Sequence, residues 1–198
     1  MKELYLRFMV SVEPDTTDRF FRIMDRLLTE KYERLHLLIS SPGGLVASGL
    51  SIYNFLRGAP FETWTYNFGS VDSISIAVYC AGSKRFAPPH ARFYIHGVHL
   101  DFNAPVSFTE TALEEHLERL RADQQQIAAL LAEATDKLPE DVLQDMRCQR
   151  TLNAAEAKEY GLVHEIKTGL IPPNAEIEVV RVGIPENHLL TNNKTVPR

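Results

Sequence analysis

A diglycine turn that follows an apolar run constrains this chain more than any other feature of its sequence. Residues 35–39 resemble a buried strand and lead directly into Ser41-Pro42-Gly43-Gly44. Glycine adopts backbone conformations that other residues avoid, so such a turn can expose main-chain N–H groups. The apolar positions of the next segment follow the helical period until Gly58 and Pro60 stop it; they are Val46, Leu50, Tyr53 and Leu56. Strand, turn and helix together predict an α/β unit.

A second apolar run begins at Ser73 and closes with an Ala-Gly pair. A serine that opens a helix lies at the positive end of the helix dipole, although most such serines are only N-caps. The strand-like residues 92–95 then deliver His96, the side-chain type best able to accept a hydroxyl proton near neutral pH. His90 and His99 compete for this role, and the place of His96 at a strand end favours it. The ordered set predicts an oxyanion hole that faces a nucleophile and a base.

Strands and helices are expected to alternate along the rest of the chain. Strands are predicted at residues 4–10, 61–66 and 92–96, in addition to 35–39. Helices are predicted after a cap at Asp15 or Thr16 and at 73–81, 110–135, 139–146 and 154–160. This order predicts an α/β fold with a βαβ-type core.

The predicted helix at 110–135 is the longest uninterrupted helical pattern, about 39 Å at 1.5 Å per residue. Its apolar stripe consists of Leu113, Leu117, Leu120, Ile127, Leu131 and Ala134. So long a helix exceeds what one small core can cover, so the stripe predicts a partner. The alternative is a helix that wraps back on its own domain.

The C-terminal part of the chain changes in character. Residues 1–168 are expected to form one domain, and 169–198 an extension. The extension contains Pro172-Pro173, a strand-like segment at 177–182 and a polar tail from Gly183, which has too little apolar surface to fold alone.

Composition excludes several classes of partner. The net charge of the 198 residues is −5, and Lys and Arg form no basic stripe, so nucleic acid is not an expected partner. Cys80 and Cys148 lie far apart and outside any Cys-x-x-Cys pair, which is typical of a reducing compartment. Neither a signal-peptide core nor the roughly 18 apolar residues of a spanning helix is found. The chain is expected to be soluble, cytoplasmic and free of membrane.

Four patterns in order resemble the proteolytic subunit family of Clp protease. They are Ser41-Pro42-Gly43-Gly44, Ser73 with Ala81-Gly82 and Lys84-Arg85, Ile95-His96, and Leu152-Asn153-Ala154-Ala155-Glu156-Ala157 running into Tyr160-Gly161-Leu162-Val163. Each alone is weak, but the four together span about residues 8 to 166 with compatible spacing.

The resemblance implies a Clp/crotonase-like fold of repeated strand-strand-helix units and a serine-type endopeptidase. Ser73 would attack a peptide carbonyl, His96 would accept its proton, and the N–H groups of Gly44 and Ile74 would form the oxyanion hole. Ile74 stands where the family usually has Met. Residues 110–135 would be the protruding handle helix that joins stacked rings of a homo-oligomer. Peptides or unfolded proteins would be the substrates, with no metal or organic cofactor.

The sequence departs from the family where the triad aspartate is expected, since that position holds Gln149. A glutamine can orient the histidine but supplies no charge, so activity is expected to be reduced unless Asp145 or Asn153 completes the triad. Residues 98–108 contain Pro105 and lack the family's glycine-rich strand. The chain also begins close to its first strand, without the family's pore loop, so docking to an unfolding ATPase is left open.

Two alternatives compete with the peptidase hypothesis. The first is a catalytically weak or inactive Clp-like scaffold or regulatory subunit, which Gln149 favours. The second is acyl-CoA chemistry on the same fold, which needs a positioned carboxylate where this chain offers a Ser/His pair.

Overall fold

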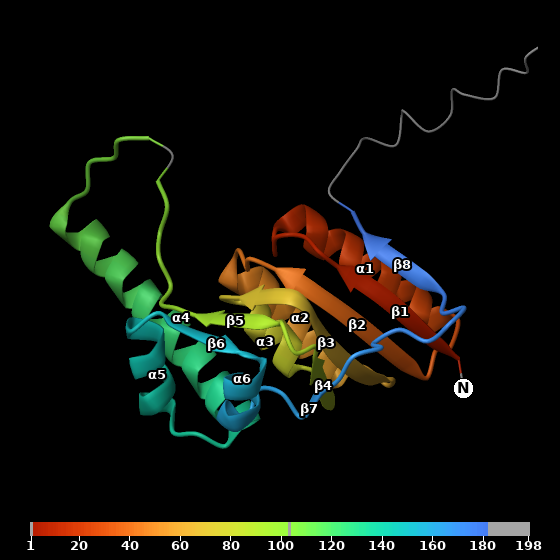
Figure 1. The fold of residues 1–198 in the computed structure, drawn as a ribbon. Coiled ribbons are helices and arrows are strands. Elements are labelled where there is room, and N and C mark those ends of the chain that lie inside the picture. Colours follow the sequence, from red (N-terminus) through yellow and green to blue (C-terminus); the bar gives the residue numbers. More distant parts are fainter. Residues whose placement is uncertain (1, 103, 182–198) are drawn as a thin grey trace, which may run out of the picture.

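The computed structural model describes residues 2–102 and 104–181 (Figure 1). The strands are β1 (Glu3–Phe8), β2 (Arg34–Ser41), β3 (Glu62–Asp72), β4 (Lys84–Ala87), β5 (Arg92–Ile95), β6 (Arg150–Asn153), β7 (Glu165–Ile166) and β8 (Ile177–Val180). The helices are α1 (Pro14–Thr29), α2 (Val46–Gly58), α3 (Ser75–Cys80), α4 (Glu110–Thr135), α5 (Pro139–Arg147) and α6 (Ala154–Tyr160). Strands and helices alternate through most of the chain, so the expected α/β class is confirmed.

One mixed sheet organises the molecule, with the strand order β6-β5-β3-β2-β1-β8; β4 branches from β3, and β7 pairs with β4. Every pair is parallel except β5 with β6. Parallel neighbours need crossover connections, and the helices between the strands supply them. The parallel core puts the carboxyl ends of β2, β3 and β5 at one edge, which is where ligands bind in α/β sheets.

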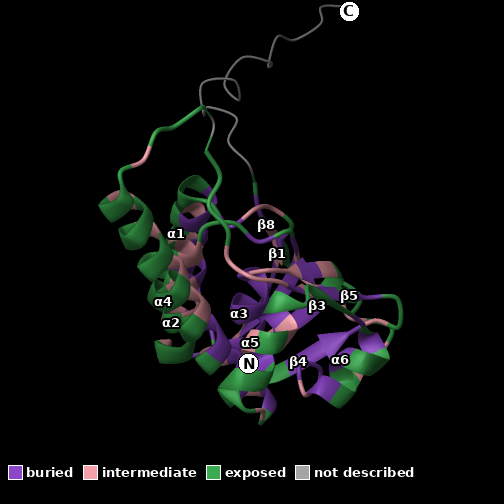
Figure 2. Ribbon diagram, turned by 90° about the vertical axis from the view of Figure 1, so that its left-hand side faces the viewer, coloured by how far each residue is buried: buried purple, intermediate pink, exposed green. Residues whose placement is uncertain are grey.

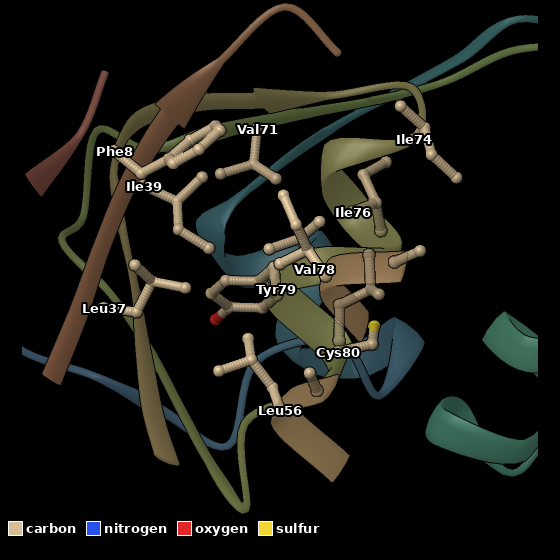
Figure 3. Packing of buried hydrophobic residues seen from close by; sticks show 14 of the residues in the cluster. Phe8, Leu37, Ile39, Leu56, Val71, Ile74, Ile76, Val78, Tyr79 and Cys80 are labelled. Atoms are coloured by element: carbon tan, nitrogen blue, oxygen red, sulfur yellow. The ribbon is translucent and has the colours of Figure 1, made fainter. Parts of the chain in front are cut away.

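The two faces of the sheet bury different side chains because successive residues of a strand point to opposite sides. Leu4, Leu6 and Phe8 of β1 belong to the main core, whereas Tyr5 belongs to a second, aromatic cluster. Figure 3 shows the main core, in which Tyr79 of α3 lies among aliphatic side chains from the strands and from α2. Burial raises the pKa of the Tyr79 phenol well above its usual value, and the same apolar surroundings raise that of the Cys80 thiol to about 12.

Two of the expected boundaries are wrong at the point that matters most. The strand predicted at 61–66 continues to Asp72, and the helix predicted at 73–81 begins only at Ser75. Ser73 lies in the turn between them, in the left-handed region with φ 57°. Hydrogen bonds to neighbouring strands hold this turn, and periodicity within one segment cannot reveal them.

The C-terminal strand joins the main sheet. β8 pairs in parallel with β1, from Tyr5 opposite Ile177 to Phe8 opposite Val180. An ion pair between Arg26 of α1 and Glu178 connects the strand to the helix above it. Residue 182, the expected end of this strand, and the polar tail from Gly183 lie outside the described residues.

Only the second half of α4 packs against the domain. Its buried residues are Ile127, Ala128, Leu131, Ala132 and Thr135. The first half projects away from the sheet, and Leu113 and Leu117 on it are 54% and 45% exposed (Figures 1 and 2). Within the described ranges, no helix is both long and apolar enough to cross a membrane.

Candidate active site

Two neighbouring parallel strands bring Ser73 and His96 to the same edge of the sheet. β3 pairs with β5, and the last pair in their register is Asp72 with Tyr94. Ser73 is the next residue after β3, and its N–H donates a 2.9 Å hydrogen bond to the carbonyl oxygen of Tyr94. His96 follows β5 directly. The sheet register therefore determines where both side chains begin.

The turn at Ser73 is held by several hydrogen bonds. A non-glycine residue in the left-handed region costs about 1–3 kcal/mol and persists only where its surroundings over-determine it. The carbonyl of Ser73 accepts from the N–H of Ile76 at 3.0 Å, and the buried hydroxyl of Ser75 donates to the carbonyls of Asp72 (2.6 Å) and Ser41 (3.1 Å). The last of these bonds connects the turn to the strand that carries the diglycine motif.

The diglycine turn lies directly against Ser73. A Cβ at Gly43, whose φ is 91°, would come within 2.6 Å of the Ser73 Cβ and 3.2 Å of its Oγ. A Cβ at Gly44 would lie 2.3 Å from the carbonyl oxygen of Val12. Contacts below 3.0 Å require the neighbour to shift, so only glycine permits this approach at both positions.

Two main-chain N–H groups near Ser73, those of Gly44 and Ile74, are candidates for an oxyanion hole. Val12 bonds to the residues on either side of Gly44, since its N–H donates to Gly43 (2.7 Å) and its carbonyl accepts from Leu45 (2.8 Å). This pattern leaves the N–H of Gly44 out of the bridge. Among residues 2–102 and 104–181, neither that N–H nor the N–H of Ile74 has a hydrogen-bond acceptor.

The ring of His96 is held in the tautomer that a general base needs. Its Nδ1 lies 2.7 Å from the carbonyl oxygen of Gly97. Because a carbonyl only accepts, this contact places the hydrogen on Nδ1 and leaves the lone pair on Nε2. The centroid of the His96 ring lies 5.0 Å from that of Tyr94, with an interplanar angle of 31°, and 5.5 Å from that of His99, with an interplanar angle of 34°.

Ser73 and His96 line one cleft of about 640 Å³. The diglycine turn forms one wall, and Arg119 and Asp123 of α4 lie on another. This volume is within the usual range for ligand sites. No hydrogen bond joins the Ser73 hydroxyl to the His96 ring in the described part of the chain; a direct proton transfer between them would require the two side chains to approach further.

Gln149 does not contact His96 through a hydrogen bond. Its side-chain oxygen accepts from the hydroxyl of Tyr94 at 3.1 Å, and its own backbone is left-handed with φ 54°. Gln149, at the position where the family has its aspartate, therefore reaches the imidazole only through the ring of Tyr94.

The two other candidates for the third triad position bind elsewhere. The carboxylate of Asp145 accepts from Arg150 at 3.0 Å and from the hydroxyl of Tyr160 at 2.8 Å. Asn153 caps α6 with its side chain. Among the described residues, neither forms a hydrogen bond with His96.

Neither Tyr94 nor the Gly97 carbonyl was predicted as part of the site. Tyr94 stands two residues before His96 on a strand, so alternation could have placed both on one face. A main-chain acceptor such as Gly97 leaves no mark in side-chain patterns. Of the two competing histidines, His99 lines the cleft, and its Nε2 lies 3.4 Å from Oδ2 of Asp101. His90 is exposed and does not line the cleft. Within the described ranges, no cluster of three or more His, Cys, Asp or Glu could hold a metal ion.

Comparison with known proteins gives matches over most of the chain. The family model described as Clp protease matches residues 1–169. ATP-dependent Clp protease proteolytic subunit 2 of Corynebacterium glutamicum is 35% identical over 136 residues, covering 68% of this chain and 66% of that protein. Proteolytic subunit 3 of Streptomyces avermitilis is 29% identical over 158 residues, covering 79% and 70%. The matches thus span about two thirds of these relatives' own length.

Among solved structures, an Asn-to-Asp mutant of ClpP1 from Listeria monocytogenes has a similar fold. The TM-score is 0.74 at 24% identity, and the match covers 83% of this chain and 91% of the other. At this identity the likeness concerns the fold alone, and it agrees with the Clp/crotonase-like fold expected from the sequence.

Proposed function

Because this chain belongs to the Clp protease family, we propose that it is a serine endopeptidase that cleaves peptides or unfolded proteins by acyl transfer. The observation that carries this proposal is the strained turn of Ser73. It is bonded to Tyr94, packed against Gly43 and open to the cleft that His96 also lines. Strain of this kind is concentrated at functional sites.

In the proposed reaction, the Oγ of Ser73 attacks the scissile carbonyl carbon while its proton passes to Nε2 of His96. The C–N bond then breaks, and His96 returns the proton to the leaving amine, which leaves an acyl group on Ser73. Water repeats the sequence in reverse and frees the new carboxyl end. The tautomer imposed by the Gly97 carbonyl supports this role, because the lone pair on Nε2 is the one that must accept the proton.

The N–H groups of Gly44 and Ile74 are the donors that we assign to the oxyanion hole. Donors that are already fixed stabilise the charge that develops in the transition state without reorganising. The side chain of Ile74 is only 1% exposed and packs against Gly49 of α2, so it anchors the amide. Isoleucine in place of methionine therefore leaves the proposed donor in position.

Among the described residues, the groups that hydrogen-bond to His96 or lie against its ring include no carboxylate, so we expect slow turnover. In a chymotrypsin-type protease, replacing the triad aspartate by asparagine lowers kcat about 10⁴-fold. Here the Gly97 carbonyl accepts from Nδ1 but carries no full charge to stabilise the imidazolium. Ser73 and His96 are thus a catalytic dyad in the proposed mechanism.

The proposed assembly is a homo-oligomer joined partly through the projecting half of α4. Leu113 and Leu117 are exposed there, and the preceding loop adds Phe102 and Val106, which are 50% and 51% exposed. Several exposed apolar side chains on one projecting segment are typical of an interaction site. Peptide cleavage needs no ATPase, whereas folded substrates would need an unfolding partner. The cytoplasm is the proposed location.

Labelling with a fluorophosphonate probe tests the function directly. We expect the probe to label the purified chain, and Ser73→Ala and His96→Ala each to abolish labelling. Ser51→Ala is the matched control, because Ser51 is exposed on α2 and its hydroxyl only donates a hydrogen bond to the Ala47 carbonyl of the same helix. Labelling that survives Ser73→Ala would refute the nucleophile. If the parent chain neither reacts nor cleaves peptides, the scaffold hypothesis is correct.

A further inference from the structure

Tyr94 contacts three separate parts of the site. Its main-chain carbonyl accepts from the N–H of Ser73 at 2.9 Å, its ring lies against the ring of His96, and its hydroxyl donates to Gln149. No single one of these contacts is unusual. Together they make Tyr94 the residue that joins the nucleophile strand, the base and the segment before β6.

The ring contact with His96 follows from strand geometry. Tyr94 and His96 are two residues apart, so their side chains leave β5 on the same face, while Ile95 between them is buried on the other. The ring centroids are 5.0 Å apart with an interplanar angle of 31°. An aromatic neighbour at this distance limits how far the imidazole can turn about its side-chain bonds.

Gln149 anchors the far end of the Tyr94 ring. An amide oxygen only accepts, so the phenol hydroxyl donates in the 3.1 Å contact. The backbone of Gln149 is held in its left-handed turn by a hydrogen bond from its N–H to the Met146 carbonyl at 3.3 Å. Both ends of the phenol ring are therefore attached to the fold, one through β5 and one through this turn.

We infer that Tyr94, anchored by Gln149, is a positioning residue that keeps the His96 ring with Nδ1 on the Gly97 carbonyl and Nε2 available to Ser73. The inference rests on the proposed function, because it assigns His96 the role of base. A neutral phenol–amide pair replaces the direct carboxylate contact in this arrangement. It orients the ring without supplying charge.

Kinetics of three variants separate the ring from the hydroxyl. Tyr94→Leu removes both, and we expect kcat for a peptide substrate to fall about tenfold with KM unchanged, since general-base catalysis contributes 10²–10⁴-fold and only part of it is lost. Tyr94→Phe and Gln149→Leu each remove the same hydrogen bond, so each should lower kcat about threefold. The double variant should be no slower than either single one.

Histidine ¹⁵N NMR gives a readout that does not depend on turnover. Spectra recorded on Ser73→Ala protein, with the His96 signal assigned by its loss in His96→Ala, report which ring nitrogen carries the hydrogen. We expect the Nδ1–H tautomer with Tyr94 present and a mixture of both tautomers in Tyr94→Leu. A change confined to overall stability would not alter this ratio.

Tyr160→Phe is the matched control, because it removes another tyrosine hydroxyl bond, to Asp145, outside the residues that line the cleft. It should leave kcat and the His96 tautomer unchanged.

The inference is overturned if Tyr94→Leu keeps both kcat and the single tautomer, or if the double variant is slower by the product of the single effects. If Tyr94→Leu fails to fold, the kcat values of Tyr94→Phe, Gln149→Leu and the double variant still test the inference. If Ser73 never reacts with the probe, the proposed function fails while the NMR result still tests Tyr94.

Discussion

The main-chain N–H of Ser73 donates a hydrogen bond of 2.9 Å to the main-chain carbonyl of Tyr94. Because His96 lies two residues after Tyr94, just beyond the end of β5, this bond sets the proposed nucleophile and the proposed base in register through the backbone.

Gly43→Ala should strongly reduce reactivity at Ser73. An added Cβ would lie 2.6 Å from the Ser73 Cβ, and the backbone φ of 91° is itself unfavourable for alanine. The turn must shift, which moves Oγ relative to His96, and small misplacements cost up to about 10²-fold in rate. The measurement is the rate of fluorophosphonate labelling. Gly58→Ala is the control, since nothing lies within 4 Å of a Cβ at that helical position, and its rate should equal that of the parent.

Arg85 is expected to be the most costly single charge to remove. It is 7% exposed, and its guanidinium donates to the carbonyls of Leu162 (2.7 Å), Ala134 (2.8 Å) and Gly161 (3.0 Å), at the ends of α4 and α6. Arg85→Met would leave one buried and two partly buried carbonyl acceptors unpaired, so the free energy of unfolding should fall by about 3 kcal/mol or more. Arg85→Lys should recover only part of it, because an ammonium lacks the planar fork. Urea denaturation of both variants provides the comparison; equal stability of parent and Arg85→Met would contradict this role.

The combined substitution Leu113→Glu and Leu117→Glu should weaken self-association without unfolding the subunit. Both side chains are about half exposed on the projecting half of α4, so the subunit core does not depend on them. Burying two carboxylates in an apolar contact is unfavourable. Sedimentation velocity should show a smaller species than for the parent. Leu138→Glu, at a residue 65% exposed beyond the end of α4, is the matched control and should not change the size. A parent chain that is already monomeric at micromolar concentration would exclude the proposed assembly.

The free energy of unfolding should decrease as the pH falls below about 6.5, because two histidines, His36 and His164, become protonated more readily in the unfolded state. Burial lowers the pKa of His36 below 6.5, with the Glu3 carboxylate opposing the shift, and burial together with the Arg85 charge lowers that of His164. The unfolded state then binds protons more readily than the folded state, so unfolding becomes easier with acidification. This stability is fully present above the unfolded-state pKa and is lost as pH falls through the folded-state values. Melting temperatures measured from about pH 8 to 5 should fall less steeply for His36→Gln than for the parent. Identical slopes would show that His36 does not contribute.

The fold was predictable from local patterns, whereas the turn at Ser73 was not. The predicted helices 110–135 and 154–160 coincide with α4 and α6, because periodicity and caps act within one segment. The left-handed conformation of Ser73 depends on a bond to Tyr94, which comes from a different strand. β4 and β6 were missed because their four residues show neither a continuous apolar run nor a clear alternation.

The apolar stripe of α4 shows a second limit of sequence patterns. All of its members satisfy the same helical period, yet Ile127 and Leu131 are buried against the subunit's own core while Leu113 and Leu117 are exposed. Packing on the same domain therefore holds for the second half of the helix, and the prediction of a partner now concerns the first half alone. Only the position of the helix relative to the sheet separates them.

Gln149→Glu should raise kcat by about three- to tenfold, or some 0.7–1.4 kcal/mol of barrier. Glutamate keeps the length of glutamine, so its carboxylate can accept from the Tyr94 hydroxyl at the present position and adds a negative charge near the imidazolium. The gain in kcat stays small because Nδ1 of His96 remains bonded to the Gly97 carbonyl. The new carboxylate is therefore separated from the imidazolium by the phenol ring of Tyr94. Peptide turnover with KM measured separately is the test, and Gln149→Leu controls for loss of the hydrogen bond. An unchanged kcat would mean that the charge is not felt at His96, and a gain above about 10²-fold would mean that the ring has turned from Gly97 to the new carboxylate.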